Sequence, residues 1–322
     1  MKKFLSRTGI FLFCVWLTAF GAGAVRMLIP VGQVVGLELG DNTVTIAAFD
    51  EEAGVAAQEA GLQVGDRILT VNGRQICTAE DVREALSCSD GAVKMTVMRS
   101  KKTTDIHLNP QITADGPKLG VYLKQGITGV GTITWYDPDS GRFATLGHGV
   151  NNSSGELLNM VSGAAYNAAV VSVKKGTCGN PGQLMGTLRG TEPIGILYKN
   201  SVQGVFGTTE TGWKGEPLPA GQPSDVKTGP AVIRCTVQGD TAREYSVKIL
   251  KVYPHSGTSG RNMLLQITDP ALLEVTGGIV QGMSGSPIIQ DGKLVGAVTH
   301  VLVNDPTTGY GIFIENMLDA AA

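Results

Sequence analysis

Short apolar stretches separated by turn residues run through most of this chain. In residues 34–39 and 43–49 the apolar side chains recur at about every second position, which is the period of a β-strand with one buried face. From residue 118 onward the same pattern predicts further strands at 131–135, 142–150, 168–173, 194–197, 202–206, 231–237, 245–253, 263–267, 288–289 and 294–301. Residues rich in Gly, Asn, Asp and Pro fill the intervals, which is typical of an all-β barrel or a pair of barrels. Near the end, only residues 316–321 are predicted to be helical.

Two short helices are predicted among the strands of the first third. Gly61 follows an acidic, alanine-rich stretch and is placed to end the first helix. Thr78 is an N-cap candidate for the second helix, and the apolar stripe of that helix is Val82, Ala85 and Leu86. We therefore predict a small domain at residues 30–109. A linker containing two prolines and a glycine follows at 110–117, and a larger domain covers 118–322.

The first 24 residues have the pattern of an export segment. Three basic residues, Lys2, Lys3 and Arg7, precede an apolar run over residues 10–20, and Ala22-Gly23-Ala24 is a small-residue cleavage pattern. A cleaved signal peptide is the first interpretation. An uncleaved membrane anchor is the alternative, because the apolar stretch approaches the length of a membrane span. Either interpretation predicts that the bulk of the chain crosses the cytoplasmic membrane.

Composition narrows the classes of function. The net charge is −2, so the chain lacks the basic excess that is typical of nucleic-acid binding. Five cysteines at irregular spacing include no CxxC pair and form no Cys/His cluster with zinc spacing. We expect neither a metal nor another cofactor. One or two disulfides and free buried thiols both remain open.

The hexapeptide at residues 282–287, Gly-Met-Ser-Gly-Ser-Pro, is the strongest candidate for catalytic chemistry. Glycines around Ser284 allow the tight turn and close ligand approach that an exposed nucleophile needs. The motif is similar to the Gly-x-Ser-Gly-x-Pro nucleophile loop of trypsin-like serine proteases. A glycine-rich turn joining two apolar strands is the alternative.

His148 is the best candidate for a partner base among the four histidines. It lies between Gly147 and Gly149 at the end of a predicted strand, where glycines permit close approach of backbone to a ligand. His107 is predicted to be a surface residue, His255 lies in a turn, and His300 is predicted either to line a cleft or to pack within a strand. His148 precedes Ser284 by more than a hundred residues, an order that fits two barrels each donating part of one site.

Residues 60–73, A-G-L-x-V-G-D-x-I-L-x-V-N-G, closely resemble a PDZ domain of the bacterial type found beside exported proteases. The resemblance implies that Gly36, Leu37, Glu38 and Leu39 form the carboxylate-binding loop and that the helix side of the peptide groove lies around Val82. A ligand peptide, which could come from the protein's own chain, would then add a strand to the sheet edge. A rigid spacer or an intramolecular brace is the alternative role for this domain.

The joint pattern of motifs over the whole exported chain resembles the stage IV sporulation protein B (SpoIVB) peptidase family. The shared features are a PDZ domain, Gly131-Thr-x-Thr-Trp-Tyr-Asp-Pro, Leu146-Gly147-His148-Gly149 and the Ser284 hexapeptide. The resemblance implies a trypsin-like double β-barrel, with Ser284 as nucleophile and His148 as general base. It also implies an acid shortly before the serine, for which Asp269 fits. The competing acids are Asp225, Asp240 and Glu192.

Trypsin-like geometry supplies three further expectations. The backbone N–H groups of Gly282 and Ser284 would form the oxyanion hole. The strand at 294–299 would pair with the substrate. Met283 stands where trypsin-like zymogens use an acid as their activation switch, so regulation would need another device, for which the PDZ domain is available.

The family resemblance implies an exported serine endopeptidase that acts between the two membranes of a developing spore. Its protein substrate would be a membrane-associated regulator of an intramembrane metalloprotease, which then processes a late sigma factor. The alternative is a non-catalytic PDZ adaptor that binds extracytoplasmic peptides. A structural envelope protein explains neither Ser284 nor His148.

Overall fold

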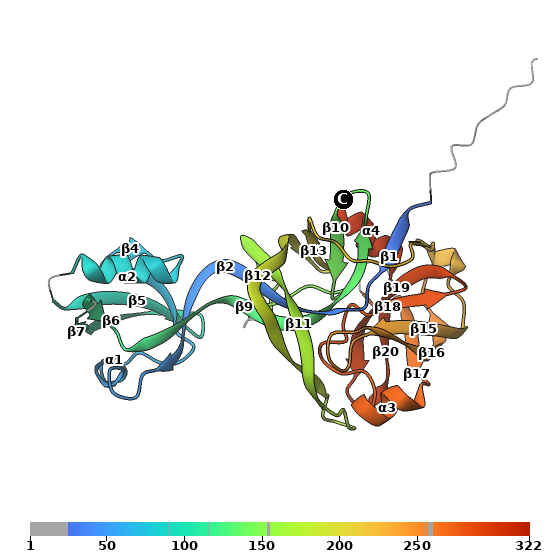
Figure 1. Ribbon diagram of the computed structural model, residues 1–322. Helices are drawn as coiled ribbons and strands as arrows, with labels where there is room; N and C mark the ends of the chain where they lie inside the picture. The colour runs from blue at the N-terminus through green and yellow to red at the C-terminus, as the bar shows by residue number, and fades with distance from the viewer. Residues whose placement is uncertain (1–24, 90, 115, 153–154, 255, 257–259) are drawn as a thin grey trace, which may run out of the picture.

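The computed structural model describes residues 25–322 except positions 90, 115, 153–154, 255 and 257–259. Two bodies are joined by a pair of long strands (Figure 1). The predicted export segment at residues 1–24 lies outside the described residues. No helix in the described part of the chain combines the length and apolar character needed to cross a membrane.

The larger body contains two six-stranded β-barrels. In the first barrel, strands β9, β10, β13, β12, β11 and β2 follow one another, and pairing of β2 with β9 closes the ring. The second is a closed barrel in the order β15, β16, β17, β20, β19, β18. The bounds of the first set of strands, with two that flank it, are β1 Met27–Pro30, β2 Val34–Phe49, β9 Val121–Asp137, β10 Arg142–Thr145, β11 Ser162–Lys174, β12 Gln183–Ser201, β13 Gly204–Thr208 and β14 Leu218–Pro219. Those of the second are β15 Gly229–Cys235, β16 Arg243–Val252, β17 Met263–Ile267, β18 Pro287–Gln290, β19 Lys293–Leu302 and β20 Asp305–Phe313. A mainly β fold with a double barrel is therefore confirmed.

The smaller body is the PDZ domain. It packs its own core, which includes Val44, Ile68, Val82 and Leu119, separately from the barrel cores. Helix α2, Ala79–Ser87, begins where Thr78 accepts a hydrogen bond from the Asp81 N–H and the Asp81 carboxylate accepts one from the Thr78 N–H. The remaining elements of this body are α1 Val55–Glu59, β3 Arg67–Val71, β4 Arg74–Gln75, β5 Val93–Arg99, β6 Lys102–Leu108, β7 Gln111–Thr113 and β8 Gly116–Lys118.

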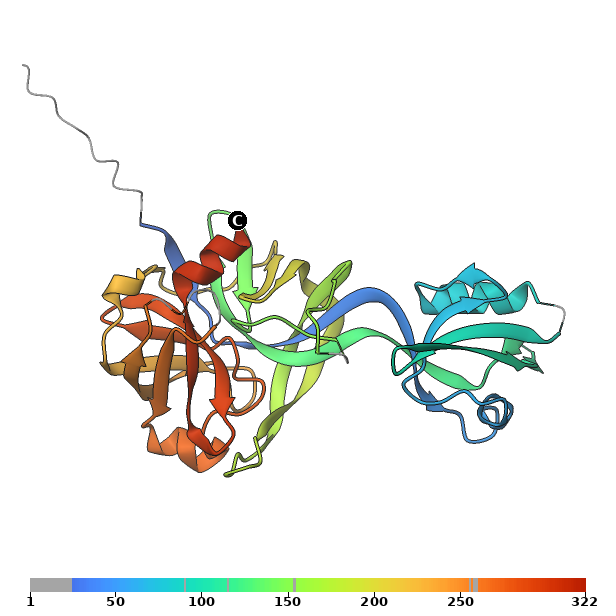
Figure 2. The ribbon, with the colours of Figure 1, turned by 180° about the vertical axis from the view of Figure 1, so that it is seen from behind.

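The PDZ domain is inserted between two strands of the first barrel and does not precede the barrel along the chain. Strands β2 and β9 pair along both bodies, with Leu37 opposite Gly129 in the barrel and Ile46 opposite Leu123 in the PDZ domain. Figure 2, which views the molecule from behind, shows the same two strands running from one body to the other. The predicted boundary at residue 30 is therefore wrong, because β1 and the first half of β2 belong to the barrel.

The linker predicted at residues 110–117 is also wrong, because this segment belongs to the PDZ domain. Strands β7 and β8 pair with each other, with Gln111 opposite Lys118, and Leu119 is buried in the PDZ core. Apolar alternation identifies the strands, but it does not say which strand each one pairs with. That choice depends on contacts between residues far apart in the sequence.

Two short helices and a 3-10 turn complete the larger body. Helix α3, Pro270–Thr276, starts at Asp269, whose carboxylate accepts hydrogen bonds from the Ala271 and Leu272 N–H groups. Gly277 ends it with a φ of 72°, in the left-handed region that favours glycine. The 3-10 turn, η1, covers Pro223–Asp225.

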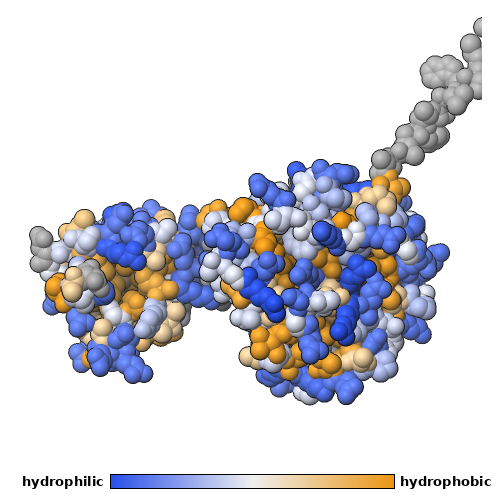
Figure 3. Space-filling view, viewed as in Figure 1, coloured by the Kyte–Doolittle hydropathy of each residue, from blue (hydrophilic) through white to orange (hydrophobic). Residues whose placement is uncertain are grey.

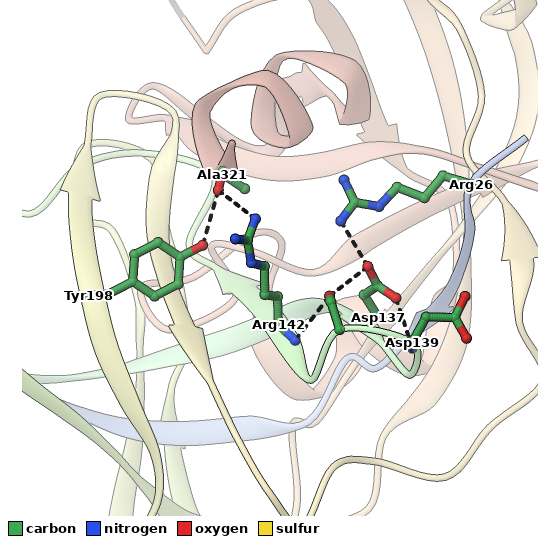
Figure 4. Close-up of polar contacts among 7 residues, drawn as sticks. Arg26, Asp137, Asp139, Arg142, Tyr198 and Ala321 are labelled. Atoms are coloured by element: carbon green, nitrogen blue, oxygen red, sulfur yellow. Dashed lines mark hydrogen bonds and ion pairs between the residues drawn. The ribbon is translucent and has the colours of Figure 1, made fainter. Parts of the chain in front are cut away.

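The C-terminal helix α4, Ile314–Ala321, packs against strands of both barrels. The Tyr198 hydroxyl donates to the Ala321 carbonyl at 3.2 Å and the Arg142 guanidinium donates to it at 3.4 Å (Figure 4). Beside them Arg26 donates to Asp137 at 2.8 Å. Burial alone would raise the pKa of Asp137, but the hydrogen bonds from Arg26, Ser140 and the Asp139 N–H together lower it.

The four cysteines in the described chain, Cys77, Cys88, Cys178 and Cys235, are free thiols. Burial raises the pKa of Cys235 to about 12, so this thiol stays protonated inside its barrel.

On the surface of both bodies, apolar and polar areas alternate (Figure 3). Exposed apolar side chains on β11 and β12 include Val171, Met185 and Leu188.

Candidate active site

The hexapeptide forms a tight loop that leads into β18. Gly282 and Gly285 have φ values of 97° and 94°, a region that other L-residues enter only with strain. A Cβ added at Gly285 would overlap the Thr132 carbonyl oxygen and the Leu146 backbone nitrogen. The glycines around Ser284 are therefore required by the turn and by its contact with the first barrel.

Hydrogen bonds from the first barrel hold this loop of the second barrel in place. The Thr132 N–H donates to the Ser284 carbonyl at 3.1 Å, and the Thr132 hydroxyl donates to the Gly282 carbonyl at 2.8 Å. Thr132 lies on β9, within the Gly131-Thr-x-Thr-Trp segment. That segment therefore has a physical role in positioning the loop that carries Ser284.

His148 follows β10 on a short loop whose backbone is itself unusual. Leu146 and Gly147 both have positive φ values, 71° and 67°, which turn the chain sharply before the histidine. The ring is half-buried, and its Nδ1 lies 2.9 Å from the Gly149 carbonyl oxygen. A carbonyl only accepts, so Nδ1 carries the proton and Nε2 keeps the lone pair that a general base needs.

Burial also tunes the basicity of this ring. Desolvation lowers the pKa of His148 below its usual 6.5, although the bond to Gly149 opposes part of the shift. The ring is therefore neutral at neutral pH and free to accept a proton.

Ser284 and His148 line the same cavity, which has a volume of about 370 Å³. The two predicted catalytic side chains thus come together from different barrels, as their order in the sequence suggests. The Ser284 hydroxyl donates to the Thr299 carbonyl at 2.9 Å. Among the described residues it makes no hydrogen bond to His148, so it must leave Thr299 before the histidine can take its proton.

The two predicted oxyanion donors are open. Within the described chain neither the Gly282 nor the Ser284 N–H donates to another protein group, whereas the N–H of Met283 between them donates to the Val280 carbonyl at 3.1 Å. An alternation of free and bonded N–H groups leaves two donors that can face one oxygen. The geometry is compatible with the predicted role, which stays a prediction.

The structure does not bring Asp269 to His148. Its carboxylate caps α3 and also accepts from the Ser246 N–H at 3.3 Å, so its oxygens serve backbone donors in the second barrel. The competing acids are engaged elsewhere as well. Asp225 pairs with Lys293 at 2.7 Å, Asp240 pairs with Arg189 at 3.3 Å, and Glu192 is exposed on β12.

His300 is a neighbour of the site that the sequence left undecided. Its ring centroid lies 5.3 Å from that of His148, and the residue is more than a third exposed, so it faces the site and is not packed inside a strand. Desolvation, with smaller effects from His148 and Arg261, lowers the pKa of His300 to about 4. His107 is exposed on β6, and His255 lies outside the described residues.

The predicted substrate-pairing edge at 294–299 needs a correction. Strand β18 pairs with β19 as far as Ala297, so that part of the edge is occupied. The Val298 carbonyl accepts the Gly285 N–H at 2.8 Å, and among the described residues no strand pairs with Thr299 and His300 on this edge. Thr299 and His300 begin the stretch beside Ser284 that an extended peptide could pair with.

The predicted carboxylate-binding loop, Gly36, Leu37, Glu38 and Leu39, is wrong. These residues lie in the first barrel, paired with β11 on one side and β9 on the other, so no peptide can add there. Leu37 and Leu39 line the cavity of Ser284 instead. This Gly-Leu strand directly precedes the PDZ domain in the sequence but pairs within the barrel.

The PDZ groove lies between α2 and the beginning of β9. A cavity of about 420 Å³ is lined there by Val82 and its neighbours on the helix and, opposite, by residues 119–123. Val82 therefore occupies the groove as predicted. Gly120, with a φ of 65° and no room for a Cβ beside Ala53, forms the sharp turn before the strand. The sequence signal was Lys118-Leu119-Gly120-Val121, directly before an alternating strand.

Comparison with curated proteins finds partial matches. The chain is 27% identical over 134 residues to a candidate zinc metalloprotease of Rhizobium meliloti (strain 1021), covering 41% of this chain and 34% of that protein. It is 33% identical over 108 residues to one of Brucella suis biovar 1 (strain 1330), covering 33% and 27%. The chain thus spans about a third or less of the length of these relatives. Within its described residues, no group of three or more His, Cys, Asp or Glu side chains could hold a metal ion.

Comparison with solved structures and with protein families extends this picture. Crystal structures of the Rv3671c protease of M. tuberculosis are similar at 16% identity. The inactive form gives a TM-score of 0.35, with 60% of this chain and 82% of that one covered. The active form gives 0.33, with 61% and 73% covered. A PDZ domain family matches residues 51–99, and the SpoIVB peptidase S55 family matches residues 115–318. The chain belongs to the SpoIVB peptidase S55 family and carries a PDZ domain.

Proposed function

We propose that this protein is a serine endopeptidase in which Ser284 is the nucleophile and His148 is the general base. One observation carries the proposal: the two side chains, donated by separate barrels, line one cavity beside the free N–H groups of Gly282 and Ser284. A nucleophile, a neutral base and two backbone donors are the parts that acyl transfer requires.

In the first half of the reaction, the Ser284 hydroxyl leaves Thr299 and gives its proton to His148 Nε2 as its oxygen attacks the scissile carbonyl carbon. The Gly282 and Ser284 N–H groups stabilise the resulting oxyanion. His148 then protonates the leaving amine as the peptide C–N bond breaks, which leaves an ester on Ser284. Water attacks that ester in the second half, again with His148 as base, and releases the acid and the free serine.

The proposed setting is regulated proteolysis outside the cytoplasm. Family membership and the apolar N-terminal segment support an exported enzyme that acts in spore development on a membrane-associated regulator of an intramembrane protease. The PDZ groove supports capture of a peptide from the substrate or from the protein's own chain. Its place between two strands of the catalytic barrel makes it a candidate regulatory element.

A serine-directed fluorophosphonate tests the catalytic proposal. The purified chain should become labelled, and Ser284→Ala should abolish labelling. Ser162→Ala, at an exposed position at the start of β11, serves as the matched control and should label like the wild type. Labelling that survives Ser284→Ala would remove Ser284 as the nucleophile. A folded wild-type chain that never labels, yet binds peptides through its PDZ groove, would favour the non-catalytic adaptor.

A further inference from the structure

The cavity that holds Ser284 and His148 has a predominantly apolar wall that the catalytic steps do not use. Leu37 and Leu39 face it from β2, and Ile127 and Gly129 face it from β9. Leu37 is paired with Gly129 and Leu39 with Ile127, so these four positions are cross-strand neighbours on one face of the sheet. Leu146 and Val150 extend the wall. Of the residues that the structure describes, no Asp, Glu, Lys or Arg lines this cavity.

The position of the wall identifies which part of a substrate would contact it. In the described chain the open edge of β19 begins at Thr299, where the Ser284 hydroxyl is bonded, and one half of an extended substrate can pair with it. No residue of β19 lines the cavity. His148, which must protonate the leaving amine, does line it. The chain that follows the scissile bond therefore leaves past His148 into the cavity.

We propose that this cavity is the specificity pocket for the leaving-group side of the substrate and selects an apolar side chain just after the scissile bond. The proposal rests on the proposed serine peptidase function. A volume of about 370 Å³ lies at the lower end of the range for ligand sites and has room for a Leu or Phe side chain. A charged side chain would lose its hydration there without gaining a partner.

The test uses the acyl-enzyme of the full chain. A peptide thioester acylates Ser284 and releases its thiol, and added amino-acid amides then compete with water for the ester. When an amide wins, its nitrogen attacks the ester carbonyl, His148 accepts the nitrogen's proton and returns it to the departing Ser284 oxygen, and a new peptide bond forms. The ratio of this product to the hydrolysed acid measures how well each amide occupies the leaving-group site. We expect leucinamide and phenylalaninamide to exceed glycinamide and aspartamide by about tenfold or more.

Three variants test whether the residues of the apolar wall cause this preference for apolar amides. Ile127→Lys places a cation in the pocket and should reverse the preference in favour of aspartamide. Gly129→Leu fills the pocket, because a Cβ at Gly129 meets no atom within 4 Å, and should reduce the preference for leucinamide at least several-fold. Thr128→Leu is the control: this exposed neighbour points to the opposite face of β9, so the wild-type preference should persist.

The possible outcomes distinguish failure of the pocket assignment from failure of the proposed peptidase function. If the acyl-enzyme forms normally but accepts leucinamide, glycinamide and aspartamide equally well, the pocket assignment is wrong and the proposed peptidase function stands. A wild-type chain that forms no acyl-enzyme overturns the proposed function, and the pocket with it. If Ile127→Lys fails to fold, Gly129→Leu still decides, since an unchanged preference in that variant contradicts the assignment.

Discussion

A backbone carbonyl takes the place beside His148 that a carboxylate holds in most serine peptidases. The Gly149 oxygen fixes the ring tautomer at 2.9 Å, but it carries no full charge to stabilise the imidazolium that forms during the reaction. The Ser284 hydroxyl meanwhile rests on Thr299. Both side chains line one cavity, and among the described residues no hydrogen bond joins them.

The first prediction concerns pH. In the proposed mechanism the neutral His148 ring is the base, and burial lowers its pKa, so the ring stays neutral as the pH falls below 6.5. The rate of fluorophosphonate labelling should therefore decline only at pH values below 6.5, with a single-proton dependence, and His148→Gln should label far more slowly at every pH. A midpoint at or above pH 6.5 would contradict a buried His148 as the base.

The second prediction concerns Asp269. Removal of its cap by Asp269→Ala should lower the free energy of unfolding by about 1 kcal/mol, while Asp269→Asn should keep most of it because Asn caps helices well. Urea denaturation measures both. If Asp269→Asn is as stable as the wild type but loses all labelling, the carboxylate has the catalytic role that the family resemblance implies, and the site must rearrange to use it.

At the scale of elements, the site is a meeting of two loops from different barrels. The Ser284 loop reaches the first barrel through Thr132, and the His148 loop returns through Leu146 against Gly285. Close backbone packing at this junction leaves no space for side chains at its glycines. The junction, more than either loop alone, positions Ser284 and His148 relative to each other.

The third prediction tests that junction. Gly285→Ala adds a methyl group that overlaps Thr132 and Leu146, so the loop must move, and labelling should fall at least tenfold. Gly292→Ala is the matched control, because Gly292 has a similar positive φ of 73° but open space around it. The control should lose only about 1–2 kcal/mol of stability from backbone strain. Equal labelling by both variants would show that the contact does not position Ser284.

For the whole molecule, the insertion of the PDZ domain is the main architectural feature. Strands β2 and β9 form the wall of the proposed leaving-group pocket and then continue into the PDZ domain, where β9 borders the peptide groove. One pair of strands thus belongs to both binding sites. This continuity gives the PDZ domain a direct physical connection to the cavity of Ser284.

The fourth prediction follows from the insertion. Replacing residues 41–125 by Asn-Gly should close β2 and β9 into a hairpin next to the Leu39–Ile127 pair, and the product should fold and label at Ser284. Deleting residues 30–109 instead removes the barrel half of β2 and should prevent folding. Circular dichroism and labelling distinguish the two. A chain that folds after the second deletion but not after the first would contradict the shared-strand architecture.

The sequence by itself determined the local features of this protein. Strand periodicity, the Thr78 cap and the glycines around Ser284 and His148 depend on neighbouring residues, so they could be recognised without coordinates. The mainly β fold and the family were predicted correctly for the same reason. The catalytic roles of Ser284 and His148 stay predictions that the cavity supports.

Only the tertiary structure decided which distant segments lie together. It moved Leu37 and Leu39 from a presumed PDZ loop to the wall of the Ser284 cavity, and it assigned the PDZ groove to the start of β9. It also placed Asp269 on a helix cap and His300 beside His148. The physical reason is common to all four: strand pairing and side-chain neighbours arise from contacts between residues far apart in the chain, and apolar periodicity carries no information about the partner.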